Sequence, residues 1–152
     1  MVPLSDAELI TRLLIAALLG GMIGAERELR RKSAGFRTNI LIAMGSALFT
    51  IVSITLAPSA SDPTRIAAQI VTGIGFLGAG AIMRTANRVQ GLTTAATVWV
   101  NAALGVAAGG GEYRAALLGG AITLAVLLIL APIERAMERR VDALPDDDDD
   151  PR

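Results

Sequence analysis

The stretch Thr38–Ser61 reads TNILIAMGSALFTIVSITLAPSAS and contains no Asp, Glu, Lys or Arg. A helix that crosses a bilayer needs roughly 20 mostly apolar residues, and this stretch supplies them without interruption. Proline lacks the backbone N–H that would continue a helix, so Pro58 marks the end. The sequence therefore predicts a transmembrane helix over about 38–57.

Four further stretches on either side of it also lack charged residues, and the chain as a whole is 53% hydrophobic and only 18% charged. They are Leu13–Ala25, Ile66–Met83, Val89–Gly111 and Ala115–Ile133. The predicted fold class is all-α, a polytopic membrane bundle of about five transmembrane helices near 7–24, 38–57, 64–83, 92–108 and 113–131. Residues 7–132 form the transmembrane domain, and 133–152 form a cytoplasmic amphipathic stub and acidic tail. The first helix is long enough only if it includes Arg12, which can pair with Glu8 one turn earlier. An alternative in which this helix lies in the membrane interface stays open.

The distribution of basic residues predicts the orientation of the bundle. Loops that carry more Lys and Arg lie in the cytoplasm. Five basic residues fall between the first two helices, two between the third and fourth, and three in the stub, against Arg12, Arg65 and Arg114 on the other side. We therefore expect the N-terminus outside and the C-terminus inside.

Composition excludes several classes of function. The net charge is zero without a basic excess, so nucleic acid binding is not expected. The chain has no Cys and no His, the usual ligands of zinc and haem. No nucleophile–base pair or paired carboxylates are recognisable. We expect no metal site, no cofactor and no enzymatic activity.

The sixteen glycines predict close helix packing. Small residues spaced by four allow helices to approach closely in lipid, as in Gly20 and Gly24. The third helix carries Gly73, Gly75, Gly78 and Gly80, and we expect it to be central or to line a dimer seam. A hinge or a discontinuous helix is the alternative. The letters Gly73-Ile-Gly75-Phe-Leu-Gly78 match a dinucleotide fingerprint, but they lie inside an apolar span rather than after a strand, so that interpretation is rejected.

Polar residues inside the spans need partners in lipid. Thr97 and Asn101 share one face of the fourth helix, and Gln69 lies in the outer half of the third. These residues predict either structural hydrogen bonds between helices or a polar pathway. At the outer turn, Asp62 and Arg65 cap the third helix or, for Asp62, contact external cations.

A second set of polar residues gathers at the cytoplasmic ends of the first four helices. It consists of Glu26, Arg27, Arg37, Thr38, Arg84, Arg88, Thr93 and Thr94. One hypothesis is a network of Glu26 with Arg37 or Arg84, open to a ligand or partner. The alternative is that these charges only anchor the helices and set the topology.

Four segments in collinear order resemble the MgtC/SapB family. They are Gly21–Glu28 (GMIGAERE), Ala34–Thr38 (AGFRT), Gly73–Gly80 (GIGFLGAG) and Arg88–Trp99 (RVQGLTTAATVW), within about 9–130. The resemblance implies the N-terminal transmembrane domain of a bacterial inner-membrane protein linked to growth at low magnesium. It also implies a regulator that acts on partner membrane proteins, including the proton-driven ATP synthase. Many members carry a soluble C-terminal domain, which we do not expect here.

The leading hypothesis is a multi-pass regulator of magnesium homeostasis or membrane energetics. Its expected partners are the lipid bilayer, a second copy of the chain or other membrane proteins. The alternative is a transporter or channel for Mg²⁺ or another ion, with a path between subunits along Gln69, Thr97 and Asn101. Magnesium prefers carboxylate oxygens, and the predicted second to fifth helices contain none, which favours the regulator.

Overall fold

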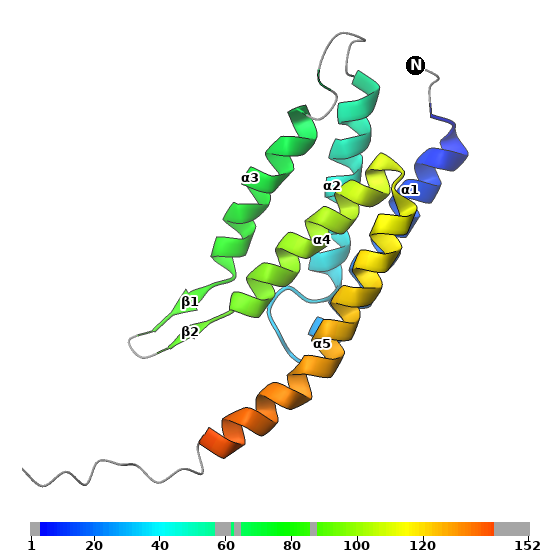
Figure 1. Cartoon of the computed structure of the whole chain (residues 1–152). Coiled ribbons are helices and arrows are strands. Elements are labelled where there is room, and N and C mark those ends of the chain that lie inside the picture. Colours follow the sequence, from blue (N-terminus) through cyan, green and yellow to red (C-terminus); the bar gives the residue numbers. More distant parts are fainter. Residues whose placement is uncertain (1–3, 57–61, 63–64, 86–87, 142–152) are drawn as a thin grey trace, which may run out of the picture.

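The computed structural model describes residues 4–56, 62, 65–85 and 88–141, with side chains described as far as Ile133. The described part holds five helices: α1 (Asp6–Leu29), α2 (Phe36–Leu56), α3 (Arg65–Gly80), α4 (Leu92–Gly110) and α5 (Tyr113–Val141). They run alternately up and down, so that the start of α1 and the end of α5 lie at opposite ends of the bundle (Figure 1). This arrangement confirms the predicted all-α bundle.

Four of these helices are long and apolar enough to cross a membrane: α1, α2, α4 and the Tyr113–Ile133 part of α5. The fifth, α3, is apolar but has only 16 residues. At 1.5 Å per residue it is about 24 Å long, shorter than the roughly 30 Å hydrocarbon core.

α3 is shorter than predicted because the chain turns into a small antiparallel ribbon. Strand β1 (Met83–Arg84) pairs with β2 (Val89–Gln90). The prediction had placed Met83 in a helix and had not foreseen the ribbon. Gly91 follows β2 with φ of 89° and brings its Cα close to the carbonyl of Ala81, where a Cβ would overlap the oxygen. A glycine is therefore required at this junction.

Of the two predicted positions of the third helix, the central one was wrong, and a place at a dimer seam stays a prediction. α4 packs against all four other helices, whereas α3 packs only on α2 and α4 among the larger contacts. Within α3 only Ile74 and Gly78 are buried. Gly73, Gly75 and Gly80 have no atoms within 4 Å of where a Cβ would stand, so their small size serves no contact among the residues that the structure describes.

The small residues that do bring helices together lie on α1 and α4. A Cβ at Gly20 would stand 2.5 Å from the carbonyl oxygen of Asn39, and one at Gly24 would stand 2.9 Å from the Phe36 backbone. Gly105 and Gly109 approach the α2 backbone in the same way. The main core is formed around these contacts by Ala16, Leu19, Ile23, Ala43, Ala47, Leu104, Ala108, Ala116 and Leu127.

Arg12 is buried at the end of the bundle where α1 begins and α4 ends. It donates to Glu8, as predicted, at 2.5 Å, and also to the carbonyl of Gly109 at 2.7 Å. Gly109 lies in the last turn of α4, where carbonyls lack helical partners and a cation is favourable. Arg12 therefore joins α1 to the end of α4.

α5 covers the bundle on one side only, and most of its Tyr113–Ile133 part is exposed. The helix continues through Pro132 to Val141, and its last turns extend past the bundle (Figure 1). The predicted stub thus begins as a continuation of α5. The side chains of its basic residues and the whole acidic tail, Asp146–Asp150, lie outside the described residues.

Candidate functional site

A charged cluster lies where the end of α1 meets the start of α4. Glu26 and Arg27 are both buried in the last turns of α1. Glu26 forms ion pairs with Arg27, at 3.8 Å, and with Arg30 one turn later. Arg27 also donates to the hydroxyl of Thr94 on α4, at 3.1 Å. This Glu26–Arg27–Arg30–Thr94 cluster ties α1 to α4 at the ends that the sequence predicts to be cytoplasmic.

The partners of Glu26 differ from the hypothesis. Arg30, not Arg37 or Arg84, reaches its carboxylate. α1 continues to Leu29 instead of ending near Gly24, so Glu26 and Arg30 stand one helical turn apart on the same face. Arg37 and Arg84 are exposed, the first at the start of α2 and the second on β1.

The other predicted members of the cytoplasmic-face set are divided between two places. Thr38 and Arg88 are exposed, on α2 and beside the ribbon. Thr93 stands beside Thr94 in the first turn of α4, and both line a pocket next to the charged cluster. The bundle therefore brings Glu26, Arg27, Thr93 and Thr94 together and leaves the remaining four outside.

The turn between α1 and α2 is held by specific hydrogen bonds. Glu28 accepts from the backbone N–H of Phe36 at 2.9 Å, and a carboxylate is favourable at such a helix start. The Asn39 amide donates back to the carbonyls of Ala34 and of Gly35. These bonds fix the turn that carries Arg30 and Lys32.

A second polar contact lies deeper in the bundle. The amide of Asn101 on α4 donates to the side-chain oxygen of Asn39 on α2 at 2.5 Å, and both residues are 0% exposed. Asn39 was not singled out from the sequence, although an amide in an apolar span is itself a signal that a partner exists. The oxygen of Asn101 has no hydrogen-bond partner among the described residues.

The three intramembrane polar residues proposed as a pathway do not lie together. Thr97 is buried and donates to the carbonyl of Thr93 in its own helix at 2.7 Å. Gln69 is exposed on α3. Asp62 and Arg65, from the predicted outer turn, are exposed as well. In the part of the chain that the structure describes, no three acidic, His or Cys residues cluster to hold a metal ion.

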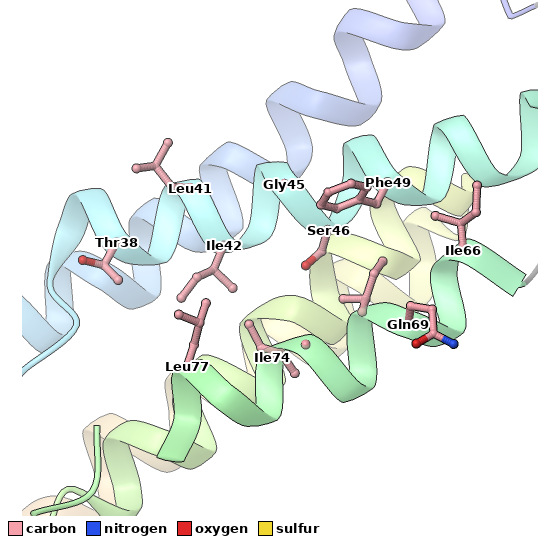
Figure 2. A pocket seen from close by; sticks show the side chains of 12 residues that line it. Thr38, Leu41, Ile42, Gly45, Ser46, Phe49, Ile66, Gln69, Ile74 and Leu77 are labelled. Atoms are coloured by element: carbon pink, nitrogen blue, oxygen red, sulfur yellow. The ribbon is translucent and has the colours of Figure 1, made fainter. Parts of the chain in front are cut away.

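An apolar groove of about 550 Å³ separates α2 from α3. Figure 2 shows Ile42 of α2 and Leu77 of α3 close together near one end, and Phe49 and Ile66 near the other. Its lining residues also include Thr38, Leu41, Gly45, Ser46, Gln69, Ile70, Gly73 and Ile74. We call this feature the α2–α3 groove.

Five apolar helices, glycine-mediated contacts and charged groups confined to the helix ends define a polytopic helical membrane protein. The model of the MgtC family matches residues 13–136. The chain belongs to the MgtC family, and it is a multi-pass protein of the bacterial inner membrane.

Curated relatives support the same assignment. The chain is 51% identical over 128 residues to a protein of Escherichia coli K12 named "Putative magnesium transporter YhiD", with 80% of this chain and 60% of the relative covered. It is 49% identical to protein MgtC of Salmonella typhimurium LT2 (90% and 56% covered) and to protein MgtC of Brucella abortus (81% and 51%). The chain thus spans between half and three fifths of the length of these relatives. No solved structure matches it.

Proposed function

We propose that this chain regulates magnesium homeostasis or membrane energetics by contacting partner membrane proteins, and that it does not itself conduct ions. The coarser conclusion, a membrane protein with a link to magnesium, comes from the family and the names of the relatives. The α2–α3 groove is the observation that supports regulation through contact with partner membrane proteins.

The interior of the bundle lacks the chemistry of an ion path. Mg²⁺ is bound through carboxylate oxygens and water. The only acidic residues in the described α1–α4 spans are Asp6, Glu8, Glu26 and Glu28, all in the terminal turns of α1. Glu8 and Glu26 are each paired with arginine. Cations beside these carboxylates oppose the entry of a divalent cation.

The groove, in contrast, suits a helix of another protein. Gly45 and Gly73 lie on its two walls, and neither has an atom within 4 Å of where a Cβ would stand. Helices associate in lipid where small residues permit close approach. The groove extends from Thr38 at the cytoplasmic end of α2 to Ile66 at the outer end of α3, so it can receive a helix over most of the span. We therefore assign it to a transmembrane helix of a partner protein.

The test compares two glycines of α3. Gly73 lines the groove, whereas Gly75 is equally open but lies on another face. A Cβ at either position meets no atom within 4 Å, but only a side chain at position 73 stands in the groove. Gly73→Leu should abolish support of growth at limiting magnesium in a strain that depends on this chain, while Gly75→Leu should retain it at equal membrane abundance.

The two variants also distinguish other occupants of the groove. Normal growth with Gly73→Leu would contradict the assignment and leave lipid chains as the occupant. Loss of growth together with loss of self-association, measured by cross-linking in the membrane, would replace the partner protein with a second copy of this chain.

Ion transport is the second candidate, and the name of the Escherichia coli relative favours it. Its predicted path between subunits requires Gln69, Thr97 and Asn101 to face a shared surface. Thr97 and Asn101 are buried inside one protomer, which argues against that path.

A further inference from the structure

A polar pocket of about 270 Å³ lies beside the Glu26–Arg27–Arg30–Thr94 cluster, at the end of the bundle that the sequence predicts to be cytoplasmic. The end of α1, the start of α4 and one face of α5 enclose it. Its lining residues are Glu26, Arg27, Arg30, Lys32, Gly91, Thr93, Thr94, Val126, Leu127, Leu130 and Ala131. The partner contact proposed above does not use this pocket.

The charges around the pocket favour an anion. Three cations, Arg27, Arg30 and Lys32, face a single carboxylate, that of Glu26. Both arginines already contact this carboxylate, so it is neutralised and the pocket keeps an excess of two positive charges. The low dielectric of the surrounding protein and lipid strengthens the attraction that these charges exert.

The start of α4 adds hydrogen-bond donors to the same pocket. Its N-cap residue, Gly91, has no side chain to accept from the first backbone N–H groups of the helix. Such a helix start favours negative charge and binds phosphate oxygens through the free N–H groups. The Thr93 and Thr94 hydroxyls stand in this first turn.

A third observation is independent of the helix start. Arg27 is only 3% exposed, and its Nε has no hydrogen-bond partner among the described residues. A buried cation is costly unless its donors are satisfied. An anion in the pocket that Arg27 lines would balance positive charge that the Glu26 carboxylate leaves uncompensated.

We propose that this pocket binds a phosphoryl group at the cytoplasmic face of the membrane. A phosphoryl group offers several oxygens at once, which suits two guanidinium groups, an ammonium group and helix N–H groups together. The apolar wall formed by Val126, Leu127 and Leu130 of α5 leaves room for an apolar portion of the ligand. Free phosphate and the headgroup of an anionic phospholipid share this chemistry.

The experiment measures binding to the full chain purified in detergent. One arm titrates inorganic phosphate and follows thermal stability. The other arm uses native mass spectrometry to count lipids retained from mixed micelles of phosphatidylglycerol and phosphatidylcholine. The test variant is Lys32→Gln, and the matched control is Arg31→Gln, because Arg31 is the preceding exposed cation and does not line the pocket.

Lys32→Gln should weaken binding about tenfold, as expected for loss of one charge-assisted contact, and Arg31→Gln should leave it nearly unchanged. A larger effect of Lys32→Gln than of Arg31→Gln on phosphate binding would identify free phosphate as a ligand. The same difference seen only for phosphatidylglycerol would identify a lipid headgroup. Equal effects of the two variants, or no binding in either arm, would overturn the proposal. Combining Lys32→Gln with Arg30→Gln should weaken binding further without relying on the buried Arg27.

Discussion

At the scale of single residues, this bundle is specified by a few polar side chains that find partners on other helices. Asn101 meets Asn39, Arg27 meets Thr94, and Arg12 meets the backbone of Gly109. Because hydrocarbon cannot supply hydrogen bonds, each polar group in a span needs a protein partner or water. These contacts join α1 and α2 to α4, the helix that packs against all the others.

The Asn39–Asn101 hydrogen bond predicts a specific loss of stability. Asn101→Leu removes the donor and leaves the side-chain oxygen of Asn39 buried without it, so the free energy of unfolding should fall by about 1–2 kcal/mol. Thr97→Val is the matched control, because the Thr97 hydroxyl bonds only within its own helix and its loss should cost less. Unfolding in mixed detergent micelles measures both. An equal loss for the two variants would mean that the interhelical bond contributes nothing specific.

The sequence could indicate which residues need partners, but it could not identify the partners. The sequence allows Asn101 either to bond between helices or to line a polar pathway, and it does not indicate that the partner is Asn39, 62 residues earlier in the chain. Because the first helix is predicted to end near Gly24, the sequence did not indicate that Glu26 lies inside α1, four residues before Arg30 at the C-cap. Which residue becomes the hydrogen-bond partner depends on where each helix ends and how it is rotated about its axis. The hydrophobic pattern does not specify either.

At the scale of elements, glycines decide which helices can approach one another. α1 and α4 contact the backbone of α2 through Gly20, Gly24, Gly105 and Gly109. Most glycines of α3, in contrast, have no atom of the described residues within 4 Å of a Cβ position. The spacing of the glycines suggested close packing for both groups. It could not distinguish packing within the chain from packing against another molecule, since the physical preference is the same in both cases.

Gly105 and Gly110 of α4 allow a test of the close contact between α2 and α4. A Cβ at Gly105 would overlap the carbonyl oxygen of Ala43 and stand 2.8 Å from the Cβ of Ser46. Gly105→Ala should therefore destabilise the bundle by about 1–3 kcal/mol, because backbone atoms cannot move aside easily. Gly110→Ala meets no atom within 4 Å and should be nearly neutral. Thermal unfolding in detergent compares the two, and equal melting temperatures would contradict the close contact between α2 and α4.

At the scale of the whole molecule, the alternation of five helices was predictable because charge-free stretches of the required length stand out in the sequence. Four of them have the length and composition to cross a membrane. The shortness of α3 and the β1–β2 ribbon were not predictable, since Met83 and Val89–Gln90 belong to stretches as apolar as the helices beside them. Gly91 was the residue that could have indicated a turn between the ribbon and α4.

The orientation of the bundle gives a whole-molecule prediction. The chain has no cysteine, so single cysteines report accessibility without interference. Ser5→Cys, at the N-cap of α1, should react with a membrane-impermeant maleimide added outside intact cells. Ser33→Cys, in the turn between α1 and α2, should react only after the membrane is opened. The reverse pattern would invert the assignment and place the charged cluster outside.

Under the proposed function, this chain regulates partner membrane proteins and does not conduct Mg²⁺ itself. The most direct measurement is Mg²⁺ flux into liposomes that contain the purified, folded protein, with Asn101→Leu and Glu26→Gln measured in parallel. We predict that all three proteins leave the liposomes as tight to Mg²⁺ as empty ones. Flux through the unaltered protein that Asn101→Leu abolishes would contradict the claim and make the chain a transporter.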